Sequence, residues 1–462
     1  MKYDCIIVGA GMSGLAAGIR LAHFGKKVCI AEKHGRGGGL NSYYNRNGIE
    51  IDTGLHAMTN FIPRGGAKNS PLMKLLRQLR IPYDELCLRE QNYSIIQFSS
   101  ASLSFSNDFD MLKTSISDKF PSEIDNFLRL DSHIMSYNEL DVNAPYVSAR
   151  KTVSGFIKNE LLVEMLFCPL MYYGSAVEKD MDFAQFAIMY KSIFREGFCR
   201  PEKGIRQLIT LLEDRFKESG GELRYNCEIR RIMNSGGKTV AAITSGGEML
   251  ETSNVLSSAG SLETMHICDE KPANFAELPE GQLSFIEAIF CIDPGTNLEG
   301  IDYSIKFFNE TDNFDYCAPD TAYSLRSGVF CCPFNFRYDE RKNERMLRLT
   351  VLANHNSWRK YDKKTYRGKK AELSEILLKK CGELCGRTDL RQRLVFSDIF
   401  TPETVRRFTG HINGAVYGSP LKFKNGRTHT EGLYLCGTDQ GFLGITGAML
   451  SGISIANMYL LK

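Results

Sequence analysis

The chain has 462 residues, of which 43% are apolar and 24% charged, a composition typical of folded proteins with a large buried core. Its 57 Lys and Arg against 54 Asp and Glu leave a net charge of +3, which argues against binding to nucleic acid. The 14 cysteines are scattered, without two pairs at zinc-binding spacing. We therefore expect no metal site and a reducing, cytoplasmic environment.

The N-terminal segment predicts a strand at 3–8, a glycine turn and then a helix. Glycine lets a ligand approach the backbone closely, and the first helical turn offers unpaired N–H groups to an anion. The turn is therefore predicted to bind a pyrophosphate through Gly9, Gly11, Met12, Ser13 and Gly14. Glu32, at the end of a second strand at 28–32 and followed by Lys33, stands where an acid binds ribose hydroxyls.

A second glycine cluster discriminates between NAD and FAD, both of which suit the first turn. It contains Arg36, Gly38, Gly39, Leu40 and Asn41, and the stretch GIEIDTGLH follows at 48–56. Arg36 and further backbone amides brought to the same pyrophosphate are more than a nicotinamide cofactor ordinarily requires. The cluster therefore favours FAD, extended across the fold.

Residues 71–80, PLMKLLRQLR, predict a short amphipathic helix with leucines on one face and Lys74, Arg77 and Arg80 on another. This pattern is typical of a helix that rests on an anionic membrane, and equally of a helix whose charged face is simply solvated. The sequence has no run of 18 apolar residues. Any membrane contact is therefore expected to be peripheral, on the inner face.

Segment 153–194 is rich in large, soft side chains that suit either a hydrocarbon tunnel or an ordinary helical core. They are Phe156, Leu161, Leu162, Met165, Leu166, Phe167, Leu170, Met171, Tyr172, Tyr173, Phe183, Phe186, Met189, Tyr190 and Phe194. The helical spacing of some of them supports a core. As a group, taken together with the resemblance described below, they favour a lipid substrate.

The middle of the chain returns to a cofactor-like pattern. A helix is expected from Ile205 to the stop at Gly220-Gly221, followed by strands at 223–232, 238–244 and 255–258. Gly236-Gly237 and Gly246-Gly247 are expected to form hairpin turns between them.

The C-terminal segment, GLYLCGTDQGFLGITGAMLSG, predicts a strand at 433–436, a glycine-rich turn and a helix from about Thr446. A second helix N-terminus thus lies beside a glycine turn. We expect a discontinuous cofactor domain made of 1–75, 200–260 and 401–462. The substrate domain would be inserted as a helical piece, 76–199, and a sheet piece, 261–400.

These motifs resemble the FAD-dependent amine oxidase and phytoene desaturase superfamily, which shares its cofactor fold with the GDP dissociation inhibitors. The resemblance implies an α/β fold with a Rossmann-like FAD-binding domain and an inserted α+β substrate domain. Many members carry Arg where this chain has Leu40, a departure for which Arg36 is a substitute. The resemblance also implies cofactor contacts at Gly54, Leu55, His56, Glu228, Ile229, Gly437, Asp439, Ile445, Thr446, Gly447 and Ala448.

The C-terminal motif and the histidine of DTGLH look most like the branch of phytoene desaturases, carotenoid isomerases and retinol saturases. That branch implies hydride transfer at flavin N5 to or from carbon–carbon bonds of an isoprenoid or carotenoid-like lipid. A flavin amine oxidase and a non-catalytic isoprenoid carrier are the alternatives. Nothing in the sequence specifies an oligomeric state.

Two residues are candidates for catalysis. His56 follows the Gly54 turn and is expected either to exchange a proton near the flavin or only to pack there. Tyr417, in NGAVYGSP, is expected either to orient the substrate or to pack against the sheet.

Overall fold

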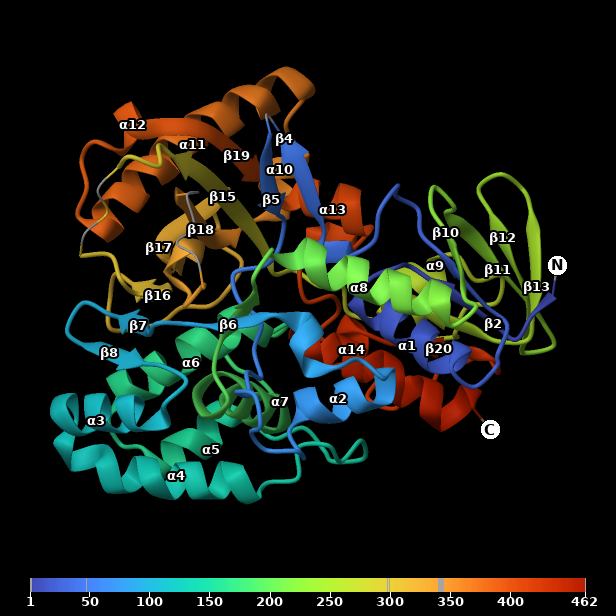
Figure 1. Ribbon diagram of the computed structural model, residues 1–462, viewed down its shortest axis with the longest axis horizontal. Helices are drawn as coiled ribbons and strands as arrows, with labels where there is room; N and C mark the ends of the chain where they lie inside the picture. The colour runs from blue at the N-terminus through green and yellow to red at the C-terminus, as the bar shows by residue number, and fades with distance from the viewer. Residues whose placement is uncertain (1, 47, 297, 299, 340–344, 462) are drawn as a thin grey trace.

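The computed structural model describes residues 2–46, 48–296, 298, 300–339 and 345–461 (Figure 1). A parallel five-stranded sheet forms one side of the molecule. Its strand order is β10 (Glu222–Arg224), β3 (Val28–Ala31), β2 (Cys5–Val8), β14 (Val255–Ser257) and β20 (Leu433–Leu435). Strands from the beginning, middle and end of the chain thus lie side by side, as predicted for an α/β cofactor domain.

Three helices pack with this sheet in one hydrophobic core. They are α1 (Met12–Ala22), α8 (Ile205–Glu218) and α14 (Gly444–Ile455). The third glycine of the first turn, Gly14, explains how closely α1 approaches β2. A Cβ there would lie 2.1 Å from the Gly9 carbonyl oxygen, so only glycine fits without movement of the backbone.

A smaller sheet lies beside the first, with the order β1 (Lys2–Tyr3), β13 (Met249–Thr252), β12 (Lys238–Thr244) and β11 (Ile229–Ser235). Both predicted hairpin turns are present, and Gly236, Gly237 and Gly247 have positive φ. The single strand predicted at 223–232 is wrong. It is split into β10 and β11, because Asn226 takes a left-handed conformation (φ 51°) and its N–H donates to the His34 carbonyl.

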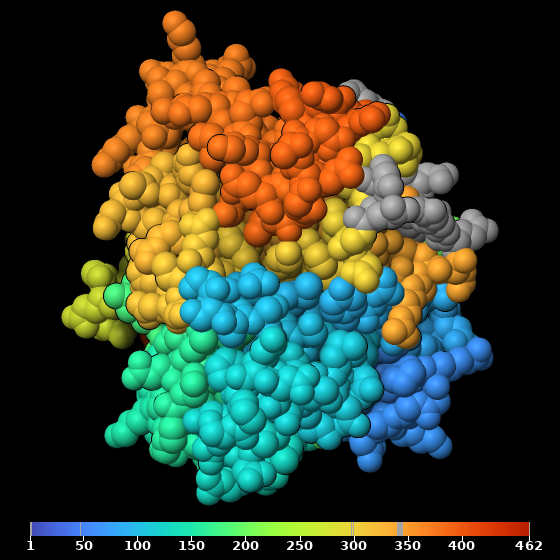
Figure 2. Space-filling view, turned by 90° about the vertical axis from the view of Figure 1, so that its left-hand side faces the viewer, coloured from blue at the N-terminus to red at the C-terminus, as the bar shows by residue number. Residues whose placement is uncertain are grey.

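The second large sheet has seven strands and mixed pairing. Its order is β19 (Leu394–Phe400), β15 (Ser284–Ile292), β18 (Arg345–Ala353), β17 (Tyr323–Cys331), β16 (Ile305–Asn309), β7 (Ser94–Gln97) and β8 (Ser102–Phe105). Two of these strands come from the piece expected to be helical, and β7 pairs parallel with β16. The two inserted pieces therefore form one continuous surface (Figure 2). The predicted domain boundaries themselves remain predictions.

Helices cover both faces of this sheet. On one face, α11 (Lys363–Cys385) packs its leucines against β15 and β18. The opposite face meets a helical group that comprises α3 (Phe109–Lys119), α4 (Ile124–Ser136), α5 (Ala149–Phe156), α6 (Glu160–Gly174) and α7 (Phe183–Tyr190). The remaining elements are β4 (Tyr43–Arg46), β5 (Ile49–Asp52), α2 (Pro71–Leu79), β6 (Leu88–Glu90), β9 (Cys199–Pro201), α9 (Ser261–His266), α10 (His355–Arg359), α12 (Leu390–Arg393) and α13 (Pro402–Thr409).

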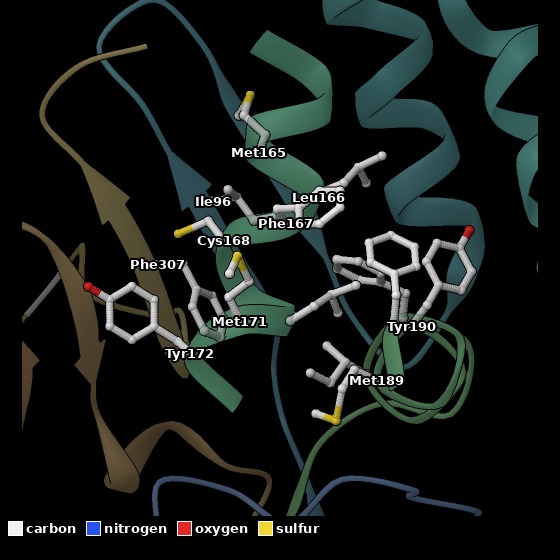
Figure 3. Packing of buried hydrophobic residues seen from close by; sticks show 14 of the residues in the cluster. Ile96, Met165, Leu166, Phe167, Cys168, Met171, Tyr172, Met189, Tyr190 and Phe307 are labelled. Atoms are coloured by element: carbon white, nitrogen blue, oxygen red, sulfur yellow. The ribbon is translucent and has the colours of Figure 1, made fainter. Parts of the chain in front are cut away.

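The soft side chains of segment 153–194 pack mainly against one another and against β7 and β16. All 15 belong to one hydrophobic cluster, fully or partly buried. Figure 3 shows Leu166, Phe167 and Met171 on α6 in one group with Ile96 on β7 and with Met189 and Tyr190 on α7. The segment is therefore chiefly a helical core.

Helix α2 is present at the predicted place, but its leucine face is not available to a membrane. Leu72, Leu75, Leu76 and Leu79 are at most 2% exposed and pack in the same core as α1 and α14. The amphipathic pattern therefore reflects packing within the protein. Across the described ranges, we find no helix long and apolar enough to cross a bilayer.

The contact between α1 and α14 brings the two ends of the chain together. A Cβ added at Gly452 would lie 2.0 Å from the Ser13 carbonyl oxygen, a contact that neither backbone can accommodate without moving. Gly155 on α5 offers a control, because a Cβ there meets no heavy atom within 4 Å.

We expect Gly452→Ala to lower the free energy of unfolding by about 1–3 kcal/mol, the usual cost of overpacking a core. Gly155→Ala should be neutral or slightly stabilising. Urea unfolding followed by circular dichroism measures both. Equal stability of the two variants would contradict the close α1–α14 contact.

Candidate active site

A large cavity lies between the five-stranded and the seven-stranded sheet and has a volume of about 1710 Å³. Pockets for one small ligand usually measure roughly 300–1,000 Å³, so this cavity has room for an extended cofactor and a substrate. Its lining comes from all three predicted pieces of the cofactor domain and from β15, β17 and β18.

Two helices present their N-termini to this cavity without a side-chain cap. The N-cap of α1 is Gly11, which has no side chain, and the N-cap of α14 is Leu443. Met12 and Ser13 on α1 line the cavity, as do Gly444 and Ile445 on α14. The unpaired N–H groups and the positive ends of both helix dipoles therefore favour an anion here.

The two glycine clusters of the N-terminal region meet at this point. The Gly38 N–H donates to the Ala10 carbonyl (2.8 Å), and Gly11 and Gly38 form an isolated parallel bridge. A Cβ at Gly11 would meet no protein atom within 4 Å. The backbone conformation of Gly11 (φ −72°) would also accept a side chain, so nothing within the protein itself requires glycine at this position. The open space in front of Gly11 is thus what a bound pyrophosphate requires.

Charged residues line the cavity beyond the glycines. The Glu32 carboxylate accepts hydrogen bonds from the N–H groups of Ala10 (2.8 Å) and His34 (2.9 Å), and retains further acceptor capacity for ribose hydroxyls. Burial lowers the pKa of Lys33, although Glu32 and Glu228 act against this effect. The Arg36 guanidinium donates to the Tyr43 carbonyl (2.7 Å) and lies over the Tyr43 ring.

The structure brings most of the predicted cofactor contacts into this one cavity. Its lining includes Gly9, Gly11, Met12, Ser13, Glu32, Lys33, Arg36, Gly38, Gly39, Leu40, Asn41, Gly54, His56, Glu228, Ile229, Gly437, Ile445 and Ala448. Their individual contacts with a cofactor remain predictions.

Five of the predicted cofactor contacts do not line the cavity: Gly14, Leu55, Asp439, Thr446 and Gly447. For Asp439 the physical reason is clear. Its carboxylate is buried and accepts hydrogen bonds from the Ser261 N–H (2.6 Å), the Ser261 hydroxyl (2.7 Å) and the Ser419 N–H (3.0 Å), while Lys422 lies 3.4 Å away. The Asp439 side chain therefore links the C-terminal glycine-rich turn to Ser261 and Ser419 inside the protein.

One wall of the cavity is formed by adjacent strands of the seven-stranded sheet. Glu287 on β15 lies directly opposite Thr350 on β18, which lies opposite Val329 on β17. Thr350 donates a hydrogen bond to the Glu287 carboxylate. We call the surrounding region the sheet end of the cavity, lined by His56, Tyr172, Tyr173, Phe285, Glu287, Val329, Thr350 and Tyr417.

His56 reaches this polar corner from the turn after β5. Its Nε2 lies 3.0 and 3.1 Å from the two carboxylate oxygens of Glu287 and 3.1 Å from the Thr350 hydroxyl. Burial would raise the pKa of Glu287, but His56 and Arg348 outweigh burial and lower it to about 2. The Glu287 carboxylate and the Thr350 hydroxyl therefore both lie within hydrogen-bond distance of His56 Nε2 and orient its ring. Both predicted roles of His56, proton exchange and packing with satisfied hydrogen bonds, fit this geometry and remain predictions.

Two buried arginines hold the turn that carries His56. Arg348 on β18 is fully buried; it pairs with Glu287 (2.7 Å) and donates to the carbonyls of Asp52 (2.9 Å) and Thr53 (2.6 Å). Arg200 on β9 pairs with the Asp52 carboxylate (2.7 Å) and donates to the His56 carbonyl (2.8 Å). The position of His56 is thus fixed from both sides.

Tyr417 lines the sheet end, but its hydroxyl is used within the protein, where it donates to the Tyr172 carbonyl. Its ring lies edge-on to Phe285 (centroids 6.0 Å apart), which favours the packing role. Of the 15 soft side chains in segment 153–194, only Tyr172 and Tyr173 line the cavity. The tunnel interpretation is therefore wrong for the others, which form the core behind the cavity.

The sequence reasoning missed Glu287, Thr350, Arg348 and Arg200. A signal existed for three of them. Glu287 is the lone charge in the apolar strand SFIEAIFCI, and Arg348 and Thr350 are polar residues two apart in RMLRLTVLA. An isolated charge in a strand buried on both faces must find a partner, and this indicates a site.

The fold and this cavity define a class: an oxidoreductase built around a parallel dinucleotide-binding sheet. The model of the family "Flavin containing amine oxidoreductase" matches residues 12–458. The chain therefore belongs to this family, and its cofactor is FAD.

Three similar proteins match nearly the whole of this chain. Prolycopene isomerase 1 of an Oncidium hybrid cultivar is 21% identical, over 99% of this chain and 83% of the relative. All-trans-retinol 13,14-reductase of Danio rerio is 22% identical, over 99% of this chain and 86% of the relative. The crystal structure of an oxidoreductase from Methanosarcina mazei superposes with a TM-score of 0.68 at 15% identity, over 99% of this chain and 100% of the other.

The open space at Gly11 gives the first test of the cofactor site. We expect Gly11→Ala to weaken FAD binding at least about tenfold, because the methyl group occupies the space of the pyrophosphate and a tenfold loss corresponds to roughly 1.4 kcal/mol. The apoprotein should keep its stability. Gly368→Ala, another glycine with no atom within 4 Å of a Cβ, is the matched control. Flavin fluorescence titration measures the affinity, and equal affinities for both variants would refute the assignment.

The pH dependence of the free energy of unfolding tests whether Glu287 is held ionised. The pKa of Glu287 is lowered to about 2, so its contribution to stability is present above its unfolded pKa, near 4.5, and is lost as pH falls toward 2. When the pH falls from 6 to 3, the free energy of unfolding should decrease by about 2 kcal/mol more in the wild type than in Glu287→Gln, which has no carboxylate to protonate at this position. Urea unfolding at each pH measures the difference.

Glu196 is a control with the opposite sign. Burial raises its pKa to about 7, despite the hydrogen bond from Asn60. Its charge therefore costs stability as pH rises from about 4.5 through 7, and Glu196→Gln should gain stability over the wild type at pH 8.

The Glu287 prediction has its own contradicting outcome. If Glu287→Gln loses as much stability in acid as the wild type, Glu287 is not held ionised by His56 and Arg348.

Proposed function

We propose that the protein uses FAD to act on carbon–carbon single or double bonds of a hydrophobic isoprenoid or carotenoid-like lipid, by desaturation, saturation or isomerisation. The observation that carries the proposal is the composition of the sheet end. Aromatic and aliphatic side chains surround one polar corner, His56–Glu287–Thr350, and this region is continuous with the cofactor cleft. Two of the similar proteins are named as an isomerase of prolycopene and a reductase of all-trans-retinol.

When bound, the flavin accepts or returns a hydride at N5. The chain's own residues then have three tasks. Tyr172, Phe285 and Val329 hold an apolar chain and exclude water. His56 exchanges the accompanying proton through Nδ1, while Glu287 orients its ring. Thr350 and Arg348 hold the Glu287 carboxylate in place.

A flavin amine oxidase is the second candidate. It is favoured by the family's description and by the aromatic pair Phe285–Tyr417 beside the Glu287 carboxylate, which would attract an ammonium group. Against it, the Arg348 guanidinium already pairs with that carboxylate. The cavity-lining lysines are Lys33, Lys363 and Lys370, and none belongs to the sheet end as defined above.

The reaction can be tested with FAD-loaded protein kept free of oxygen. Prolycopene and all-trans-retinol are incubated with the oxidised and the dithionite-reduced protein, and products are separated by chromatography and mass spectrometry. We expect a saturated, desaturated or isomerised product from at least one lipid. His56→Gln should lower the turnover rate about 100-fold, the typical contribution of a general acid or base, with unchanged FAD content. His429→Gln, at an exposed histidine outside the cavity lining, is the control.

Other outcomes identify the alternatives. Bleaching of the flavin by putrescine or benzylamine, with no lipid product, would contradict the proposal and favour an amine oxidase. Tight binding of a prenyl lipid by cofactor-free protein, without turnover, would favour a carrier.

A reducing, cytoplasmic location is part of the proposal. It is supported by the 14 cysteines, all of which are free thiols, most of them buried. Peripheral contact with the inner face of a membrane also remains a proposal, to which helix α2 gives no support.

A further inference from the structure

One buried polar atom at the sheet end has no partner in the protein. It is the phenolic oxygen of Tyr173, near the C-terminus of α6, for which no hydrogen-bond partner exists among the residues that the structure describes. The ring itself is well held, with centroids 5.0 Å from Phe198 and 5.7 Å from Phe307. Tyr173 also lines the cavity, so an unpaired buried hydroxyl belongs to a residue of the cavity wall.

The neighbouring acceptors are already occupied. The Tyr172 carbonyl accepts from Tyr417, and the Glu287 carboxylate accepts from His56, Thr350 and Arg348. A buried hydroxyl without a partner is unfavourable, and such groups are rare in native proteins unless water or a ligand satisfies them. Tyr173 thus differs from Tyr172, whose hydroxyl bonds to the Ser327 hydroxyl (2.8 Å).

The electrostatic surroundings define what Tyr173 can offer. Burial raises its pKa well above 10, and Cys331 and Tyr417 act in the same direction, so the phenol keeps its proton. It is therefore a hydrogen-bond donor. Nearby charges act in both directions, since Arg200 lowers the pKa of Tyr173 and Glu287 raises it. Arg200 already pairs with Asp52, and Glu287 with Arg348, so these ion pairs leave no unpaired charge for a charged ligand group and favour a neutral acceptor.

We infer that the Tyr173 hydroxyl donates a hydrogen bond to a neutral oxygen of the substrate, so that the substrate is an oxygen-bearing isoprenoid, an alcohol or a carbonyl compound, and not a pure hydrocarbon. This inference rests on the proposed function and narrows its substrate class. Tyr173 acts in it as a specificity-determining residue. The aromatic walls hold the apolar chain, and the phenol recognises its oxygen.

The test compares ligands that differ only in that oxygen, with FAD-loaded protein in the oxidised state and without oxygen gas. The first pair is all-trans-retinol and axerophthene, the same polyene without the hydroxyl. The second pair is cyclohex-2-enone and cyclohexene. Because neither compound is a polyene, this pair tests recognition of the oxygen even if the protein binds no polyene. Dissociation constants are measured by the change in flavin fluorescence.

We expect the wild type to bind the oxygen-bearing member of a pair at least about tenfold more tightly, since a site built to hydrogen-bond an oxygen discriminates against its absence. Tyr173→Phe should weaken that member about tenfold and leave the hydrocarbon unchanged. Its thermal midpoint should not fall, because an unpaired polar atom is removed. Tyr190→Phe, whose hydroxyl donates to Asp131 outside the cavity lining, should change neither constant.

The outcomes separate this inference from the proposed function. Discrimination in the enone pair without any polyene binding would overturn the proposed function alone. Equal binding within each pair, absence of binding by every ligand, or equal losses for both members in Tyr173→Phe would overturn the inference. A loss of FAD affinity in Tyr173→Phe, with ligand discrimination retained, would assign the hydroxyl to the cofactor and overturn it as well.

Discussion

The turn that follows β5 depends on two buried arginines that approach it from different parts of the fold. Arg200 pairs with Asp52, and Arg348 pairs with Glu287 while donating to backbone carbonyls of the same turn. A buried pair of this kind is costly to break, typically about 3–5 kcal/mol when one partner is removed. Because Arg348 and Glu287 belong to the seven-stranded sheet, the network fixes the sheet relative to the cofactor side of the cavity.

This network explains why chemistry is concentrated in one corner. His56 is presented by the turn, Glu287 and Thr350 by the sheet, and their contact at about 3 Å exists only because the turn is held. The rest of the sheet end is aromatic or aliphatic. A flavin needs few side chains for hydride chemistry, so an apolar chamber with one proton-exchanging group is a sufficient arrangement.

The cofactor half of the fold could be predicted because its motifs are local. Glycines at fixed spacing, Glu32 at the end of a strand and the glycine-rich C-terminal turn each carry their own physical meaning, and each motif contributes residues to the lining of one cavity. The substrate half could not, because Glu287, Thr350 and Val329 are neighbours only through strand register. The amphipathic and aromatic segments were ambiguous for a related reason: burial against protein and burial against lipid require the same residues, as Leu72 on α2 shows.

A crystal structure of the FAD-loaded protein tests the central claim most directly. We expect the pyrophosphate against the N-terminal turn of α1 and the flavin ring between the turn of His56 and the start of α14, facing Glu287 and Thr350. A flavin ring that lies away from the sheet end, or an N-terminus of α1 that contacts no phosphate, would contradict it.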